Sequence, residues 1–179
     1  MIAIISGTNR AGSRTLQVAK IIETIYKELQ LDARILNLMD LPQALFSPAS
    51  YAEKPGAFAP FSETVLNASG LVIVTPEYNG GFPGVLKLFI DMLKFPESFQ
   101  HKPVCFVGLS AGRWGALRPV EQLQQIFAYR NAHIFPDRTF MPGISDLLED
   151  DGKLKDPAIG DRLKKQAMEF CDFIRHLEK

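Results

Sequence analysis

Three uninterrupted apolar stretches, each leading directly into a polar loop that contains glycine, constrain the fold of this chain most strongly. They occupy residues 1–5, 71–74 and 103–109. A strand that is covered on both faces reads as a continuous apolar run, whereas a strand with one face in water alternates apolar and polar residues. The three runs therefore predict strands of a parallel sheet that is covered on both faces.

Between and beyond these strands, the sequence shows helical periodicity. Apolar residues recur at helical spacing from about residue 15 to residue 30, and residues 33–38 are then expected to form a strand. The other expected elements are helices at residues 61–69, 85–95 and 120–129 and from Pro157 onward, and a fifth strand at residues 133–140. Five strands that alternate with helices predict an α/β fold with a doubly wound parallel sheet.

Two segments lack any period. Residues 40–60 are rich in proline, alanine and serine, with Phe46, Tyr51 and Phe58 spread among them. A loop of this length in a compact domain is usually functional or mobile, and we expect one here. Residues 146–156 are polar and are expected to be irregular.

Length and charge exclude several classes of protein. At 179 residues the chain fits one domain, residues 1–179. Its 20 basic residues balance 20 acidic ones, so no net charge attracts nucleic acid or an anionic membrane. No apolar run reaches the roughly 18 residues of a membrane span, and the chain starts in a strand without a basic leader. We therefore expect a cytoplasmic protein.

The cysteines and histidines do not form a metal site or a disulfide framework in the sequence. Cys105 lies within an expected strand and Cys171 on the apolar side of the last helix, which favours reduced, buried thiols. The three histidines, at 101, 133 and 176, are scattered, and none has a second candidate ligand at helical spacing. We expect no bound metal.

The polar loop after the first strand has the composition of an anion site. Thr8, Ser13 and Thr15 supply hydroxyl groups and Arg10 a guanidinium, just before a helix whose first N–H groups attract anions. The loop lacks both the Gly-Lys-Ser/Thr ending of a P-loop and the G-x-G-x-x-G of a dinucleotide turn. A hydroxyl-rich cradle suits the phosphate of a mononucleotide such as FMN. Alternatively, Ser13 merely caps the helix and the glycines shape a tight turn.

Three such loops, at residues 7–15, 76–84 and 110–115, directly follow expected strands. In a doubly wound sheet, ligands bind at the carboxyl ends of the strands. The loops are therefore expected to converge on one site.

Together the loops resemble those of the NADPH-dependent FMN reductases. The first loop is similar to the family pattern G-S-x-R-x-x-S-x-N, with Thr8 and Thr15 in place of Ser and Asn. The second carries Pro-Glu-Tyr-Asn at 76–79 and Pro-Gly-Val-Leu-Lys at 83–87, followed by Leu88 where the family often has Asn. The third resembles the glycine-rich loop beside the flavin, with Trp114 as an added bulky residue. The resemblance covers residues 1 to about 129.

The resemblance implies a flavodoxin-like fold, a five-stranded parallel sheet of order 2-1-3-4-5 in a three-layer sandwich. It also implies bound FMN, with NADPH or NADH as donor and a small acceptor such as a quinone or a free flavin, in a ping-pong hydride transfer. No side chain would be catalytic, because the cofactor carries the chemistry. The implied contacts are Thr8, Arg10, Ser13 and Thr15 for the phosphate, Pro76, Glu77, Tyr78 and Asn79 for the ribityl chain and ring, and Ser110, Gly112 and Arg113 for the other edge of the ring.

Two other functions stay open at this point. Residues 108–112 spell G-x-S-x-G, so Ser110 is a candidate hydrolase nucleophile with Asp172 and His176 as partners. A flavin-binding electron carrier or sensor without turnover is the other alternative. The choice between NADPH and NADH is also open, because no arginine cluster in the sequence marks a 2′-phosphate site.

The expected helix at 85–95 suggests a homodimer or homotetramer. Only Lys87, Asp91 and Lys94 interrupt its apolar surface, which is wider than one sheet face covers. Alternatively, residues 40–60 of the same chain cover the remainder.

Overall fold

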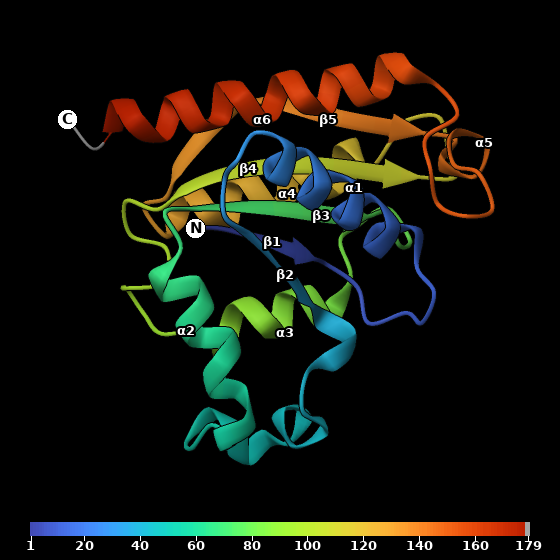
Figure 1. Cartoon of the computed structure of the whole chain (residues 1–179). Helices are drawn as coiled ribbons and strands as arrows, with labels where there is room; N and C mark the ends of the chain where they lie inside the picture. The colour runs from blue at the N-terminus through green and yellow to red at the C-terminus, as the bar shows by residue number, and fades with distance from the viewer. Residues whose placement is uncertain (178–179) are drawn as a thin grey trace.

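Five parallel strands form one sheet in the order β2-β1-β3-β4-β5 in the computed structural model, which describes residues 1–177 (Figure 1). The strands are β1 (Ile2–Ser6), β2 (Ala33–Asn37), β3 (Gly70–Pro76), β4 (Pro103–Ser110) and β5 (His133–Pro142). This order confirms the predicted doubly wound, flavodoxin-like sheet.

Helices cover both faces of the sheet, which makes three layers (Figure 1). They are α1 (Arg14–Glu28) and α6 (Pro157–Leu177) on one face, and α2 (Ala59–Asn67), α3 (Gly84–Met92) and α4 (Leu117–Tyr129) on the other. Successive residues of β1 alternate between the two cores: Ile4 packs with α1 and α6, and Ile5 packs on the opposite side. This explains why the strand sequences are continuously apolar. Within residues 1–177, no helix is both long and apolar enough to cross a membrane.

The segment expected to be a long loop is instead a series of short helical turns. They are η1 (Leu38–Asp40), η2 (Gln43–Phe46), η3 (Pro48–Tyr51) and η4 (Gly56–Phe58), which leads into α2. Each turn is too short to show a helical period. Prolines 42, 48 and 55 stand at or beside the starts of three of them, where the fixed φ of proline suits a helical turn.

This segment packs against α3. Leu41, Leu45 and Phe58 are buried in the same core as α3, and the Phe58 ring lies 6.1 Å from that of Phe89. Much of the apolar surface of α3 is thus covered by its own chain. This agrees with the alternative that residues 40–60, rather than a second copy, cover the helix. The width of that surface alone does not require a second copy.

Two element boundaries differ from expectation. α3 ends at Met92 rather than at residue 95, because the backbone is already extended at Leu93, with φ of −76° and ψ of 151°. β5 continues to Pro142, beyond a shift in its pairing with β4 between Val104 and Phe106. A four-residue helix, α5 (Ile144–Leu147), follows it and overlaps the segment expected to be irregular.

Candidate functional site

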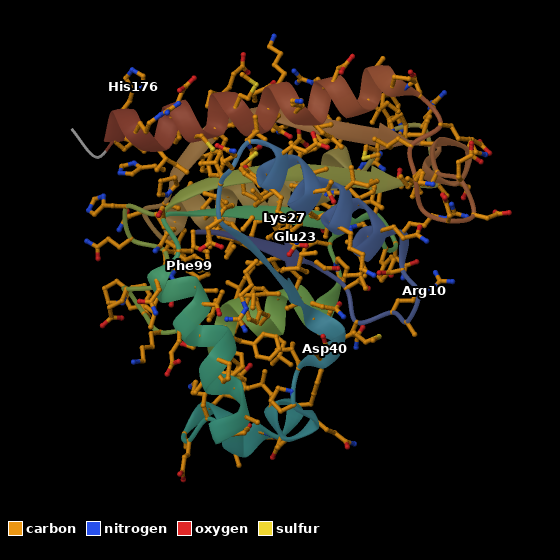
Figure 2. All side chains as sticks on the ribbon, viewed as in Figure 1. Arg10, Glu23, Lys27, Asp40, Phe99 and His176 are labelled. Atoms are coloured by element: carbon orange, nitrogen blue, oxygen red, sulfur yellow. The ribbon has the colours of Figure 1, made fainter. Side chains whose placement is uncertain are left out.

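A cavity of about 520 Å³ lies at the carboxyl ends of the strands. All three glycine-containing loops contribute to it, as the sequence predicted. Its lining residues are Arg10, Ala11, Gly12, Ser13, Arg14 and Thr15 from the first loop, Pro76, Glu77 and Tyr78 from the second, Leu109, Ser110 and Ala111 from the third, and Ile144 and Ser145 after β5. Figure 2 shows Arg10 on the loop between β1 and α1, at this end of the sheet.

The first loop leaves the sheet at Gly7. The Gly7 N–H donates to the Val74 carbonyl at 2.9 Å, and a Cβ at Gly7 would lie 2.8 Å from that same oxygen. Only glycine fits so close to the neighbouring strand. The chain then turns through Gly12, whose φ of +62° also favours glycine, and enters α1.

The start of α1 presents unpaired donors to the cavity. The Ser13 side chain caps the helix, since its Oγ accepts the Leu16 N–H at 3.2 Å, and Ser13 also lines the cavity. No group in residues 1–177 accepts a hydrogen bond from the main-chain N–H groups of residues 11–15. The cap therefore leaves these N–H groups without a partner, and a helix terminus of this kind is a suitable place for a phosphate.

Thr8 joins the first loop to the second. It is fully buried and does not line the cavity. Its Oγ1 lies 2.9 Å from the Tyr78 hydroxyl and accepts the Arg10 N–H at 3.3 Å. Through these two contacts, Thr8 fixes the positions of Tyr78 and Arg10, which line the cavity. The sequence did not reveal these contacts.

The second loop turns at Asn79 and Gly80. Both residues have positive φ, 52° and 77°, and Tyr78 and Gly81 exchange main-chain hydrogen bonds of 2.8 and 3.0 Å around them. This is the geometry of a type I′ turn, which favours Asn-Gly. Asn79 is exposed and lies outside the cavity lining.

Glu77 carries the negative charge of the second loop. Its side chain is 17% exposed, and its Oε1 lies 3.9 Å from Nη1 of Arg118 at the start of α4. Because Arg118 stands outside the three expected motifs, sequence analysis did not find this pair.

The third loop folds back against β5. The Ser110 hydroxyl donates to the Gly112 carbonyl at 2.9 Å, and Gly115, with φ of +58°, lies so close to β5 that a Cβ would come within 3.0 Å of the Met141 nitrogen. Gly112 and Arg113 do not line the cavity. The Arg113 guanidinium instead lies over the ring of Trp114, 4.9 Å from its centroid.

This geometry excludes the hydrolase alternative. α4 begins only at Leu117, so Ser110 is not on a strand-to-helix elbow. His176 lies near the end of α6, at the opposite end of the sheet from the cavity (Figure 2), and its Nδ1 contacts the carbonyl of Asp172 at 2.6 Å. The three residues do not form a triad.

Sequence analysis missed the fourth wall of the cavity. Ile144 and Ser145 follow β5, and Arg14 reaches this wall by donating from Nη1 to the Ser145 carbonyl at 3.5 Å. The strand was expected to end at residue 140, so the loop after it was not recognised. The available signal was Gly143, which directly follows the strand with φ of +61°.

The cavity lining contains neither histidine nor cysteine. Both cysteines are free; Cys105 is buried within β4, and burial raises the pKa of its thiol. In residues 1–177, no cluster of three or more histidine, cysteine, aspartate or glutamate side chains is arranged to hold a metal ion. The arrangement is that of a site which binds a ligand rather than one that supplies a nucleophile.

Comparison with known proteins identifies the family. The model of the family NADPH-dependent FMN reductase matches residues 1–145. A quinone reductase of Escherichia coli (strain K12) is 30% identical over 178 residues, which cover 96% of this chain and 94% of that protein. An NADPH azoreductase of Bacillus sp. (strain OY1-2) is 28% identical, with 92% and 89% covered. The solved structure of FerB, a flavoenzyme NAD(P)H:(acceptor) oxidoreductase from Paracoccus denitrificans, shares the fold with a TM-score of 0.82, at 22% identity over 98% of this chain and 97% of that one. The chain therefore belongs to the NADPH-dependent FMN reductase family and is an FMN-dependent NAD(P)H oxidoreductase of flavodoxin-like fold.

Proposed function

We propose that this protein passes a hydride from NADPH or NADH, by way of FMN held in the cavity, to a small acceptor such as a quinone or a free flavin. The observation that carries the proposal is the row of unpaired N–H groups at residues 11–15, beside the hydroxyl groups of Ser13 and Thr15. Hydrogen bonds to a charged group are the strong ones, at roughly 1.5–3 kcal/mol each.

The donor set fits the phosphate of FMN. Residues 10–15 contain no acidic side chain, and Arg10 and Arg14 supply positive charge. We assign the phosphate to Arg10, Ser13 and Thr15, with Thr8 acting through its contacts to Tyr78 and to the Arg10 N–H.

The remaining walls fit the rest of the cofactor. Pro76, Glu77 and Tyr78 are placed along the ribityl chain and the ring, and Ser110 lies at the other edge. Asn79 and Gly112 contribute through the shapes of their loops. The two-electron redox chemistry is supplied by FMN when it is bound, and the protein holds and orients it.

The arrangement of the loops around the cavity also bears on the order in which the electron donor and the acceptor bind. Loops after β1, β3, β4 and β5 line the cavity, and we propose that they leave one side of the bound flavin open to the nicotinamide and to the acceptor. Since both must reach the same side, we propose that the donor leaves before the acceptor binds.

The purified protein tests this function directly. We expect a yellow protein with flavin absorption, or a colourless one that takes up added FMN, and oxidation of NADPH that depends on added benzoquinone. A protein that binds FMN but shows no turnover would be an electron carrier or sensor. A protein that takes up no FMN would overturn the proposal.

We propose in addition that the protein is a homo-oligomer in the cytoplasm. Two free cysteines suit a reducing compartment. Between α3 and α4 lies a groove of about 480 Å³, and we propose that a second copy of the chain covers it. Its lining includes the apolar side chains Phe82, Ile90 and Ile126, beside Lys87 and Asp91, which form an ion pair within one chain at 2.7 Å. Tyr129, which is 81% exposed, borders it.

Sedimentation equilibrium tests the assembly. The wild-type protein is expected to be a dimer or tetramer at micromolar concentration, and Tyr129→Lys to shift it toward the monomer. A wild-type monomer would refute this part of the proposal and leave the cofactor site untouched.

A further inference from the structure

Four arginines lie in, or within a few residues of, the segments that line the cavity. Arg10 and Arg14 line it, and Arg118 lies 3.9 Å from the lining residue Glu77. Arg113 is outside the lining and stands two residues after the lining residue Ala111. This cluster forms on a chain with no net charge, and only the fold brings it together.

Arg113 is the one arginine of these four that is assigned neither to the FMN site nor to Glu77. Among residues 1–177 it forms no ion pair, and its guanidinium lies 4.9 Å from the ring centroid of Trp114. Trp114 is the only tryptophan of the chain and is 53% exposed. An exposed indole beside a guanidinium offers an apolar face for stacking together with a charged donor.

The loop that carries this pair is well anchored. Gly112 accepts hydrogen bonds from the Ser110 hydroxyl and from the Gly143 N–H, at 2.9 and 3.3 Å. The Trp114 carbonyl accepts the Leu117 N–H at 3.1 Å. Because the main chain of the loop is already ordered, binding a ligand there costs little further ordering of the backbone.

Resting on the proposed function, we infer that Arg113 and Trp114 recognise the 2′-phosphoadenosine half of NADPH and so favour NADPH over NADH. The indole provides a stacking surface for the adenine, and the guanidinium provides a fork for the 2′-phosphate. Arg10 and Arg14 are assigned to the FMN site and Arg118 faces Glu77, which leaves Arg113 to meet a second phosphate.

Calorimetric titration of the FMN-loaded enzyme with 2′,5′-ADP and with 5′-AMP tests the assignment. Arg113→Ala should weaken 2′,5′-ADP binding about tenfold, equivalent to about 1.4 kcal/mol, and change 5′-AMP binding less than twofold. Trp114→Ala should weaken both, and Trp114→Phe should restore most of the loss. Arg34→Ala removes the same charge from an exposed position on β2, outside the cavity lining, and should change neither.

Kinetics supply the second readout. In Arg113→Ala, the ratio of kcat/KM for NADPH to that for NADH should fall about tenfold, through a higher KM for NADPH. If the ratio and 2′,5′-ADP affinity both match wild type, the assignment is wrong while the reductase function stands. If the wild-type enzyme oxidises neither nucleotide, the proposed function is wrong, and the 2′,5′-ADP titrations still decide whether this loop binds a phosphoadenosine.

Discussion

At the scale of single residues, Ser13 has two roles that a substitution can separate. Its Oγ caps α1 and also faces the cavity. Ser13→Ala should lower the free energy of unfolding by about 1 kcal/mol through loss of the cap. It should also raise the Kd for FMN about tenfold through loss of a hydrogen bond to the phosphate. Denaturant unfolding of the apoprotein and titration of FMN fluorescence measure the two effects.

Ser47 provides the matched control. It caps η3 by accepting the Ala49 N–H at 3.3 Å and does not line the cavity, so Ser47→Ala should leave the affinity for FMN unchanged.

Arg10→Ala should weaken FMN binding as Ser13→Ala does. Unchanged FMN affinity in both site variants would remove the phosphate from this loop.

Tyr26 should make stability depend on pH in alkaline solution. Burial raises the pKa of its phenol, and the nearby thiols of Cys105 and Cys171 raise it further. The unfolded chain ionises near the ordinary pKa of about 10, while the folded chain keeps the proton. The stabilising contribution is therefore complete below about pH 10 and is lost as pH rises further, by up to about 1.4 kcal/mol per pH unit.

Urea unfolding at several pH values between 9 and 11 measures this dependence. Tyr26→Phe should make the fall in unfolding free energy above pH 10 shallower, because the group that titrates is removed. Tyr51→Phe deletes a hydroxyl from an exposed side chain outside the proposed interface and serves as the control. Identical slopes for wild type and Tyr26→Phe would show that another group, such as the buried Cys105, controls the alkaline limit.

At the scale of elements, the segment between β2 and α2 is stabilised by one aromatic cluster. The Phe58 ring stacks on Phe61 at 6.1 Å and meets Phe89 of α3 edge to face. Phe58→Ala should cost about 3–5 kcal/mol of unfolding free energy. Phe46, which is 49% exposed in the same segment, is the control, and Phe46→Ala should cost much less. Equal, small losses in thermal or urea unfolding would mean that the segment does not support α3.

The same segment shows what sequence patterns do and do not predict. The strands were predictable because burial on both faces makes each one continuously apolar, as residues 71–74 illustrate. The turns η1 to η4 were not, because three or four residues cannot show a period. For α3, the pattern predicted a wide buried surface correctly, but only the fold shows that Phe58 and its neighbours cover much of it.

The site was predictable to a similar extent. Loops after three strands were found because each carries glycine and hydroxyl or amide side chains directly after an apolar run. The wall after β5 was missed because the strand was expected to end at residue 140, whereas regular pairing with β4 continues to Pro142. Contacts between loops, such as Thr8 with Tyr78 and Glu77 with Arg118, join residues that are distant in sequence and need the fold.

At the scale of the whole molecule, the sheet separates stability from function. Both cores occupy its faces, and the loops of the cavity gather at the carboxyl ends of its strands (Figure 1). The elements that surround the cavity on several sides are thus held by two independent cores. We therefore expect the cavity to keep its shape while substrates exchange.

A single open side predicts a kinetic pattern. With NADPH varied at several fixed concentrations of benzoquinone, double-reciprocal plots should give parallel lines, because the donor must leave before the acceptor can enter. A high concentration of either substrate should inhibit competitively against the other, since both occupy the same space. As a control, Arg34→Ala changes a residue outside the cavity lining and should give the same pattern as wild type. Converging lines would require both substrates to be bound together, and the proposed single open side would then be wrong.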